Sequence, residues 1–73
     1  MNVLTKYAKQ DINLAKREGR VAVCGTKAGN VEIEFSGGLF TFKNFNTGET
    51  LSGQLNQAEA ILKLASLYVV EGA

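Results

Sequence analysis

Two short stretches in which apolar and polar residues alternate constrain the fold more than any other feature of the chain. In residues 31–35, Val31, Ile33 and Phe35 alternate with two glutamates, and residues 39–45 repeat the pattern with phenylalanines. Successive side chains of a β-strand point to opposite faces, so strict alternation predicts a sheet with one dry face and one wet face. Such a sheet is stable only if another part of the chain covers its dry face.

Turn-forming residues separate the predicted strands. Residues 20–26 are rich in β-forming residues, and a hairpin turn is predicted directly afterwards at residues 29–30. The turn-forming segments Ser36-Gly37-Gly38 and Asn46-Thr47-Gly48 predict two further turns. The pattern of residues 49–52 is weak, so the sequence leaves open whether a fourth strand forms there.

Two other segments have the spacing of amphipathic helices. Apolar residues recur at helical intervals over residues 3–18, and Gly19 supplies a stop. Asn56 and Glu59 form a predicted capping box, so a second helix should run from about residue 57 to residue 70.

Together these elements predict one α+β domain that covers residues 1–73, in the order α-β-β-β-α. The strands should form an antiparallel meander of three strands, or of four if the weak segment pairs. Both helices should pack on the one apolar face of this sheet.

The residue types that most catalytic and metal sites need are missing from the chain. It has no histidine, and Cys24 is its one cysteine. Ser-His-Asp and Cys-His arrangements therefore cannot be built, and neither can an intrachain disulfide or a zinc site of His and Cys ligands. Cys24 lies in the predicted strand at 20–26, where we expect a buried and unreactive thiol. We therefore expect a protein that is not an enzyme and that uses no cofactor and no metal.

The hydropathy of the chain bears on its location. No stretch approaches the roughly 20 apolar residues that a membrane span requires, and the first residues lack the apolar run of a secretory signal. A single cysteine fits a reducing compartment. We therefore expect no membrane partner and a cytoplasmic location, which is the host cytoplasm if the protein is encoded by a phage.

The charges are distributed unevenly along a chain whose net charge is +1. Residues 1–20 hold five Lys and Arg against two acids, a local +3, and residues 21–73 hold three lysines against five glutamates, a local −2. Side chains that share one arc at about 100° per residue are Lys6, Lys9, Asn13, Lys16, Arg17 and, just beyond the helix, Arg20. This arc predicts a footprint for nucleic acid or for an acidic partner, with a merely solvated face as the alternative.

Asp11 projects into the apolar arc of the same helix. It lies at the rim of this arc, marks a kink in the helix, or contacts a partner.

The second helix is apolar over about 240° of its circumference, far more than the ~100° stripe of a surface helix. One sheet cannot cover so wide a surface. Either part of it is buried between the sheet and the first helix, or it contacts a protein partner or a second copy in a homodimer. The residues expected in such an interface are Ala60, Leu64, Leu67 and Tyr68.

Two resemblances follow from these features. The order α-β-β-β-α in a chain of this length resembles double-stranded-RNA-binding domains, although residues 55–60 lack the lysine cluster that this family carries at the start of its last helix, and its Pro/His loop is missing. The small, proline-free design is similar in style to small phage-encoded accessory proteins, among them anti-CRISPR-type inhibitors.

The second resemblance implies a non-enzymatic protein-binding module of a phage or mobile element. Such a module would modulate or inhibit a larger host complex through the apolar helix surface, and at a net charge of +1 it would act by blocking an interface rather than as an acidic DNA mimic. Protein binding is therefore the first hypothesis. Nucleic-acid binding through the basic arc of the first helix is the alternative.

Overall fold

The computed structural model describes residues 3–68, and six elements follow one another along this part of the chain. They are α1 (Val3–Glu18), β1 (Arg20–Thr26), β2 (Gly29–Ser36), β3 (Leu39–Asn44), β4 (Thr50–Leu55) and α2 (Gln57–Leu67). The α+β class is confirmed. The fourth strand forms, so the order is α-β-β-β-β-α and differs by one strand from the order of the double-stranded-RNA-binding domains.

The sheet is an antiparallel meander with the strand order β1-β2-β3-β4. Ile33 of β2 pairs with Val21 of β1 on one side and with Phe42 of β3 on the other. Paired residues point to the same face of a sheet, so these three apolar side chains share one face. Ile33 and Phe42 are fully buried there, together with Val31 and Phe40. The alternation in the sequence therefore marks the dry face of this sheet.

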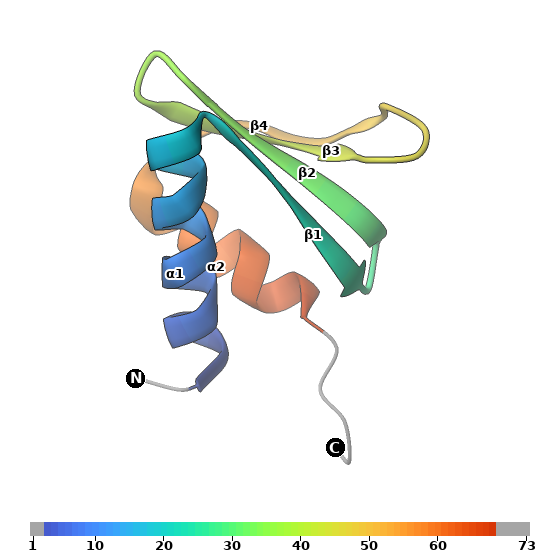
Figure 1. Ribbon diagram of the computed structural model, residues 1–73. Coiled ribbons are helices and arrows are strands. Elements are labelled where there is room, and N and C mark those ends of the chain that lie inside the picture. Colours follow the sequence, from blue (N-terminus) through green and yellow to red (C-terminus); the bar gives the residue numbers. More distant parts are fainter. Residues whose placement is uncertain (1–2, 69–73) are drawn as a thin grey trace.

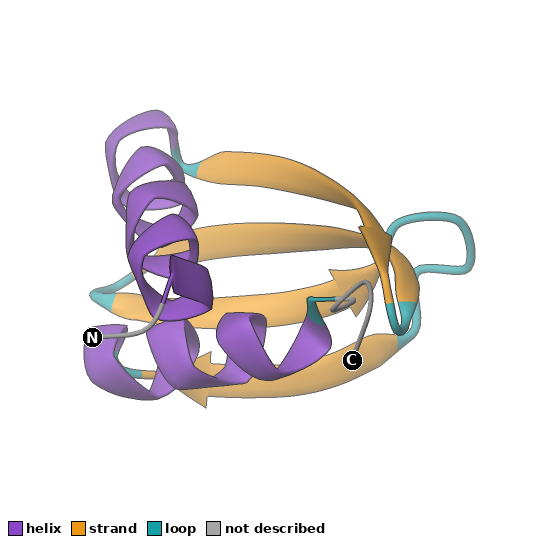
Figure 2. Ribbon diagram, turned by 90° about the horizontal axis from the view of Figure 1, so that it is seen from below, coloured by secondary structure: helices purple, strands orange, loops and turns teal. Residues whose placement is uncertain are grey.

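Both helices pack against the dry face, below the sheet in Figure 1, and they cross one another there (Figure 2). α1 contributes Ala8, Ile12 and Ala15 to the core, and α2 contributes Ala60 and Leu64; all five are fully buried. The distance between packed helices depends on the side chains at the contact, and three alanines allow a close approach.

Two side-chain hydrogen bonds tie the ends of α2 to α1. Gln57 Nε2 donates to Asn13 Oδ1 at 3.1 Å, and Tyr68 Oη donates to Asp11 Oδ2 at 2.7 Å. Two residues along a helix correspond to a rotation of about 200°, so the two acceptors lie on different sides of α1. The start and the end of α2 therefore hold α1 from both sides.

The β2–β3 turn is the one that the sequence predicts. Gly37 and Gly38 have φ values of 61° and 81° and form a two-residue loop between the paired residues Ser36 and Leu39. Two consecutive left-handed residues match the right-handed twist of a hairpin, and glycine adopts them without strain.

The β1–β2 turn lies two residues earlier than predicted. Thr26 Oγ1 accepts the N–H of Ala28 at 3.1 Å and donates to the carbonyl oxygen of Gly29 at 2.6 Å. These bonds close the turn over residues 27–28, because Thr26 and Gly29 become its flanking pair. The side chain of Asn30 instead accepts the N–H of Gly25 at 3.4 Å. The prediction of a turn at 29–30 is therefore wrong.

β4 is longer and less regular than the segment left open at 49–52. Its register against β3 shifts on both sides of Phe42. Gln54 has a φ of 57°, which is left-handed for a residue other than glycine. Such irregularities break the two-residue period of a strand, and this explains the weak pattern in the sequence.

α2 begins at the predicted capping box. Asn56 Oδ1 accepts the N–H of Glu59 at 2.9 Å, and Glu59 Oε1 accepts the N–H of Asn56 at 3.1 Å. The helix ends at Leu67, since Tyr68 already has extended backbone angles. The last two residues of the predicted helix, 69 and 70, lie outside the described residues.

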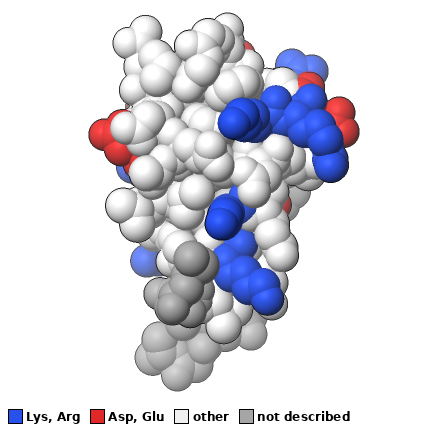
Figure 3. Space-filling model, turned by 90° about the vertical axis from the view of Figure 1, so that its left-hand side faces the viewer, with Lys and Arg blue, Asp and Glu red and all other residues white. Residues whose placement is uncertain are grey.

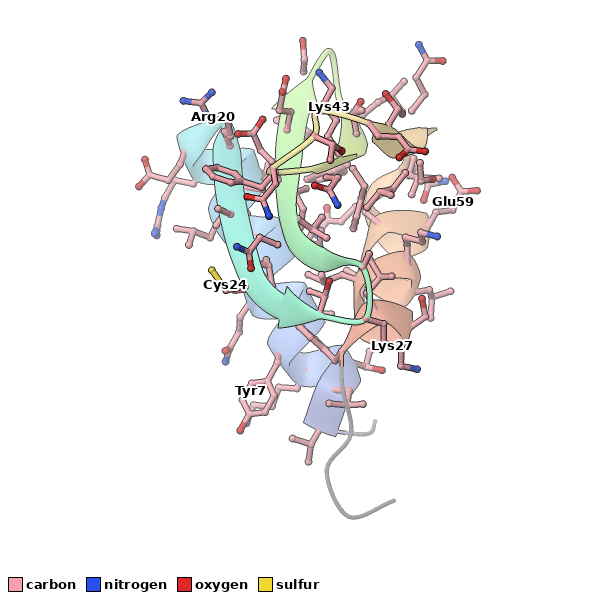
Figure 4. All side chains as sticks on the ribbon, turned by 90° about the vertical axis from the view of Figure 1, so that its right-hand side faces the viewer. Tyr7, Arg20, Cys24, Lys27, Lys43 and Glu59 are labelled. Carbon is pink, nitrogen blue, oxygen red and sulfur yellow. The ribbon has the colours of Figure 1, made fainter. Side chains whose placement is uncertain are left out.

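The opposite face of the sheet is not covered by either helix. Val21 and Val23 take the inward positions of β1, so Arg20, Ala22 and Cys24 are directed outward and are exposed. Figure 4 shows the Cys24 sulfur directed away from the ribbon. The prediction of a buried thiol is therefore wrong, because β1 has only one dry face.

The orientation of α2 can be tested with two leucines of that helix. Leu64→Ala should lower the free energy of unfolding by about 2–5 kcal/mol, because it leaves a cavity in the core. Leu62→Ala is the matched control: Leu62 is 66% exposed, and its truncation should change the free energy of unfolding by less than about 0.5 kcal/mol. Urea unfolding followed by circular dichroism measures both. Equal losses would contradict the orientation of α2.

Candidate functional site

The polar residues predicted as a footprint on the first helix lie together on the structure. We call Lys6, Lys9, Asn13, Lys16, Arg17 and Arg20 the basic face; all six are exposed. Figure 3 shows Lys and Arg side chains in a row down the side of the molecule on which α1 lies. Five members therefore share one arc of α1, whereas Arg20 is directed outward from the start of β1.

Local structure explains how the basic face is formed. Ala8, Ile12 and Ala15 hold the opposite arc of α1 against the core, so the charged arc is turned to solvent. Gly19 ends the helix with a φ of 86°, and its N–H donates to the carbonyl oxygen of Ala15 at 2.7 Å. This stop places Arg20 at the start of β1, directly after the helix.

The cations of the basic face differ in their partners. Arg17 lies 3.9 Å from Glu18, and Arg20 lies 3.9 Å from Glu32, both at the outer limit of an ion pair. The side chains of Arg17 and Arg20 are 74% and 69% exposed, and such long ion pairs at a surface contribute little to stability. Both arginines therefore keep most of their capacity to bind an anion. Among residues 3–68 the structure shows no ion pair for Lys6, Lys9 or Lys16, which makes these lysines the most available charges of the face.

Asn13 has a different position from the other members. Its Oδ1 accepts the hydrogen bond from Gln57, so the side chain lies beside the start of α2. Asn13 therefore connects the basic face to the second helix.

The predicted interface on α2 is wrong for two of its four residues. Ala60 and Leu64 are fully buried, because α2 contacts both the sheet and α1 and uses two sides of its apolar circumference for the core. Leu67 and Tyr68 are half-buried at the edge of this core. The alternative explanation from the sequence, burial between the sheet and the first helix, is the one that holds for Ala60 and Leu64.

The outer arc of α2 nevertheless carries an apolar side chain. Leu62 is 66% exposed, and Ala58 one turn before it is exposed as well. The other exposed large apolar residues lie outside α2; they are Val3, Tyr7, Leu39 and Phe45. Single apolar residues are normal on a protein surface, so the outer arc of α2 is a small candidate surface.

A pocket that the sequence did not predict lies between α1, the end of β1 and the end of α2. It has a volume of about 360 Å³ and is lined by Leu4, Tyr7, Gln10, Asp11, Gly25 and Tyr68. The backbone N–H of Lys27 donates to the carbonyl oxygen of Leu67 at 2.7 Å. This bond fixes the end of α2 to the β1–β2 turn, so the walls of the pocket that come from β1 and α2 are held together.

Asp11 and Tyr68 form the polar centre of this pocket. Burial and, next, the hydrogen bond and negative charge of Asp11 raise the pKa of Tyr68 well above its usual value. The phenol therefore stays protonated and remains a hydrogen-bond donor to the carboxylate. The one signal in the sequence was Asp11 in an apolar arc; its partner lies 57 residues further along the chain, beyond the reach of periodicity.

Within residues 3–68 there is no group of three or more His, Cys, Asp or Glu side chains that could hold a metal ion. Neither α1 nor α2 is long and apolar enough to cross a membrane. No known protein family, no curated protein and no solved structure matches this chain.

The hydrogen bond between Asp11 and Tyr68 can be tested by titrating the phenol. The chain has two tyrosines, so a Tyr7→Phe variant leaves Tyr68 as the one absorbing phenol. Its pKa should lie above the usual value of about 10, and adding Asp11→Asn should lower it by removing the negative charge. Ultraviolet absorbance of the phenolate measures both variants. An unchanged pKa after Asp11→Asn would contradict the contact.

The same bond has a consequence for stability at high pH. Because the pKa of Tyr68 is raised in the folded state, its contribution to stability is fully present below the pKa of the unfolded phenol, about 10. That contribution is lost as the pH rises through the folded value. In Tyr68→Phe, the free energy of unfolding should therefore fall less steeply above pH 10 than in the parent protein.

Proposed function

We propose that this protein is a non-catalytic binding module that docks the phosphate backbone of a nucleic acid on the basic face of α1. The observation that carries the proposal is the set of three exposed lysines, Lys6, Lys9 and Lys16, that have no ion pair among the described residues, flanked by two exposed arginines. Phosphate contacts by Lys and Arg supply most of the affinity in binding that is independent of sequence.

The dimensions of the basic face suit this role. Lys6 and Arg17 are eleven residues apart, which corresponds to about 16 Å along a helix. One strand of duplex DNA carries a charge about every 3.4 Å along its axis. The face therefore spans roughly five phosphates, which is close to its own number of cations.

The unequal distribution of charge supports the same orientation. The acids of the chain outnumber its lysines after residue 20, so the rest of the molecule repels a polyanion while the basic face attracts it. The exposed Cys24 thiol suits a reducing compartment. We accordingly place this function in the cytoplasm.

Neutral substitutions on the basic face test the proposal. At physiological salt, the parent protein should bind a fluorescent 16-base-pair duplex with a dissociation constant of about 10⁻⁴–10⁻⁶ M, and added salt should weaken the binding. Lys9→Gln with Lys16→Gln should reduce the slope of log K against log salt by about 1.8, since each phosphate contact contributes roughly 0.9. Fluorescence anisotropy at several salt concentrations measures this slope.

The matched control removes the same number of positive charges, two, at a distance from the basic face. Lys27→Gln with Lys63→Gln removes two lysines from the β1–β2 turn and from α2, and it should leave the slope unchanged. An equal loss in both double variants would show that only the net charge matters. That result, or no retention of the duplex by the parent protein at about 50 mM salt, would reject the proposal.

A protein partner or a second copy of the chain is the second candidate. The observation that favours it is the exposure of Leu62 on the outer arc of α2, beside Ala58. A contact there would block or bridge a larger assembly without the core residues Ala60 and Leu64. The protein-binding hypothesis, which includes inhibition of a larger host complex, is therefore a proposal for the surface around Leu62.

Self-association tests this second candidate directly. If α2 forms a homodimer, light scattering at high concentration should give a mass of twice 7.8 kDa, and Leu62→Glu should return it to the monomer. Phe45→Glu is the control, because Phe45 is 54% exposed in the turn after β3 and its substitution should not affect the mass. A monomeric mass for the parent protein would exclude the homodimer.

A further inference from the structure

Among residues 3–68, the pocket between α1, β1 and α2 is lined by one acidic side chain and no basic one. Its residues are Leu4, Tyr7, Gln10, Asp11, Gly25 and Tyr68. None of the ion pairs found in residues 3–68 includes Asp11. The carboxylate therefore gives the pocket a negative charge that no described side chain of the protein neutralises.

The carboxylate is partly used and partly available. Asp11 Oδ2 accepts the hydrogen bond of Tyr68, at 2.7 Å. A carboxylate has about four lone-pair positions on its two oxygens, so further donors can be accepted. The raised pKa of Tyr68 keeps the phenol neutral, and the tyrosine adds no second negative charge.

The remaining walls are aromatic and apolar. Tyr7 and Tyr68 bring two π-systems to the pocket, and Leu4 adds an aliphatic surface. Figure 4 shows Tyr7 projecting from α1 on the same side of the molecule as Cys24 of β1. Aromatic faces attract cations and tolerate the methylene or methyl groups attached to them. An inorganic ion would gain little from such walls, whereas an organic cation contacts both the charge and the rings.

We propose that this pocket is a binding site for an organic cation, namely an alkylammonium or guanidinium group. The charged head pairs with the Asp11 carboxylate, and its carbon substituents lie against Tyr7, Tyr68 and Leu4. The volume of about 360 Å³ accommodates one such group with its chain, and it lies within the range of ordinary ligand sites, about 300–1,000 Å³.

The basic face does not occupy the same arc of α1. At about 100° per residue, the lysines and Arg17 of the basic face lie at least about 120° around the helix from Asp11. The cation site and the polyanion site are therefore separate surfaces of one helix. The proposal does not depend on nucleic-acid binding.

Choline and its neutral carbon isostere, 3,3-dimethylbutan-1-ol, provide a matched pair of probes. Titration of the full chain, followed by amide chemical shifts, should show saturable shifts at Leu4, Tyr7 and Gly25 with choline. The isostere should bind at least about tenfold more weakly, the size of a roughly 1–2 kcal/mol electrostatic preference. Equal binding of both probes, or no shifts at these residues, would overturn the proposal.

Two variants separate the local charge from the general field of the protein. Asp11→Asn keeps an acceptor for Tyr68 but removes the charge, and it should weaken choline binding about tenfold. Glu18→Gln removes an exposed acid of the same helix and should leave binding unchanged. Equal losses of choline affinity in the two variants would overturn the proposal, because the charge of Asp11 would then have no more effect than any other acid of the helix.

A third variant tests the aromatic wall and does not depend on the stability of the Asp11 variant. Tyr7 is 52% exposed, so Tyr7→Leu should fold normally and should bind choline severalfold more weakly. Unchanged binding would exclude the tyrosine from the site.

The source of the cation is resolved by a second set of probes. The peptides Gly-Lys-Gly, Gly-Arg-Gly and Gly-trimethyllysine-Gly present the same chemistry as part of a chain. Tighter binding of a peptide than of choline assigns the pocket to a side chain of a protein partner. Tighter binding of choline assigns it to a free small molecule.

Discussion

The apolar face of the sheet must be kept from water, and the rest of the structure depends on how this is done. The two central strands, β2 and β3, present Val31, Ile33, Phe40 and Phe42 on one face of the sheet, and burial of large side chains like these is the main favourable contribution to folding in so small a chain. Both helices are used for this one face. The other face of the sheet consequently remains open to solvent, and the outward arcs of the two helices are also free for binding.

The regular parts of the fold could be predicted because their signals are local. Alternation identified the dry face, and the capping box at Asn56 located the start of α2. The β1–β2 turn could not be placed, because the hydroxyl of Thr26 closes it by two hydrogen bonds that composition does not reveal. β4 was uncertain since its bulges interrupt the period. The exposure of Cys24 follows from the register of β1, which only pairing with β2 fixes.

The candidate surfaces also differ in how far the sequence could predict them, again because some depend on local signals and others on tertiary contacts. Five members of the basic face lie on one helix, so periodicity alone brought them together; Arg20 follows after Gly19, at the start of β1. For α2, periodicity gave the width of the apolar arc but not which of its residues face the core. That orientation depends on how α1 and the sheet each pack against α2. The pocket requires three separate elements to meet, and its central hydrogen bond joins residues 57 positions apart. No pattern within one segment contains that information.

One helix thus has three different environments around its circumference: the core, a basic arc exposed to water, and a partly enclosed acidic pocket. Salt acts unequally on the last two. At physiological ionic strength, exposed charges more than about 8 Å apart are largely screened, so the attraction of the basic face for a polyanion weakens quickly with added salt. The carboxylate of Asp11 is half-buried and lies among rings and aliphatic groups, where screening is weaker. A ligand of the pocket should therefore persist at salt concentrations that remove a polyanion from α1, and this difference follows from burial alone.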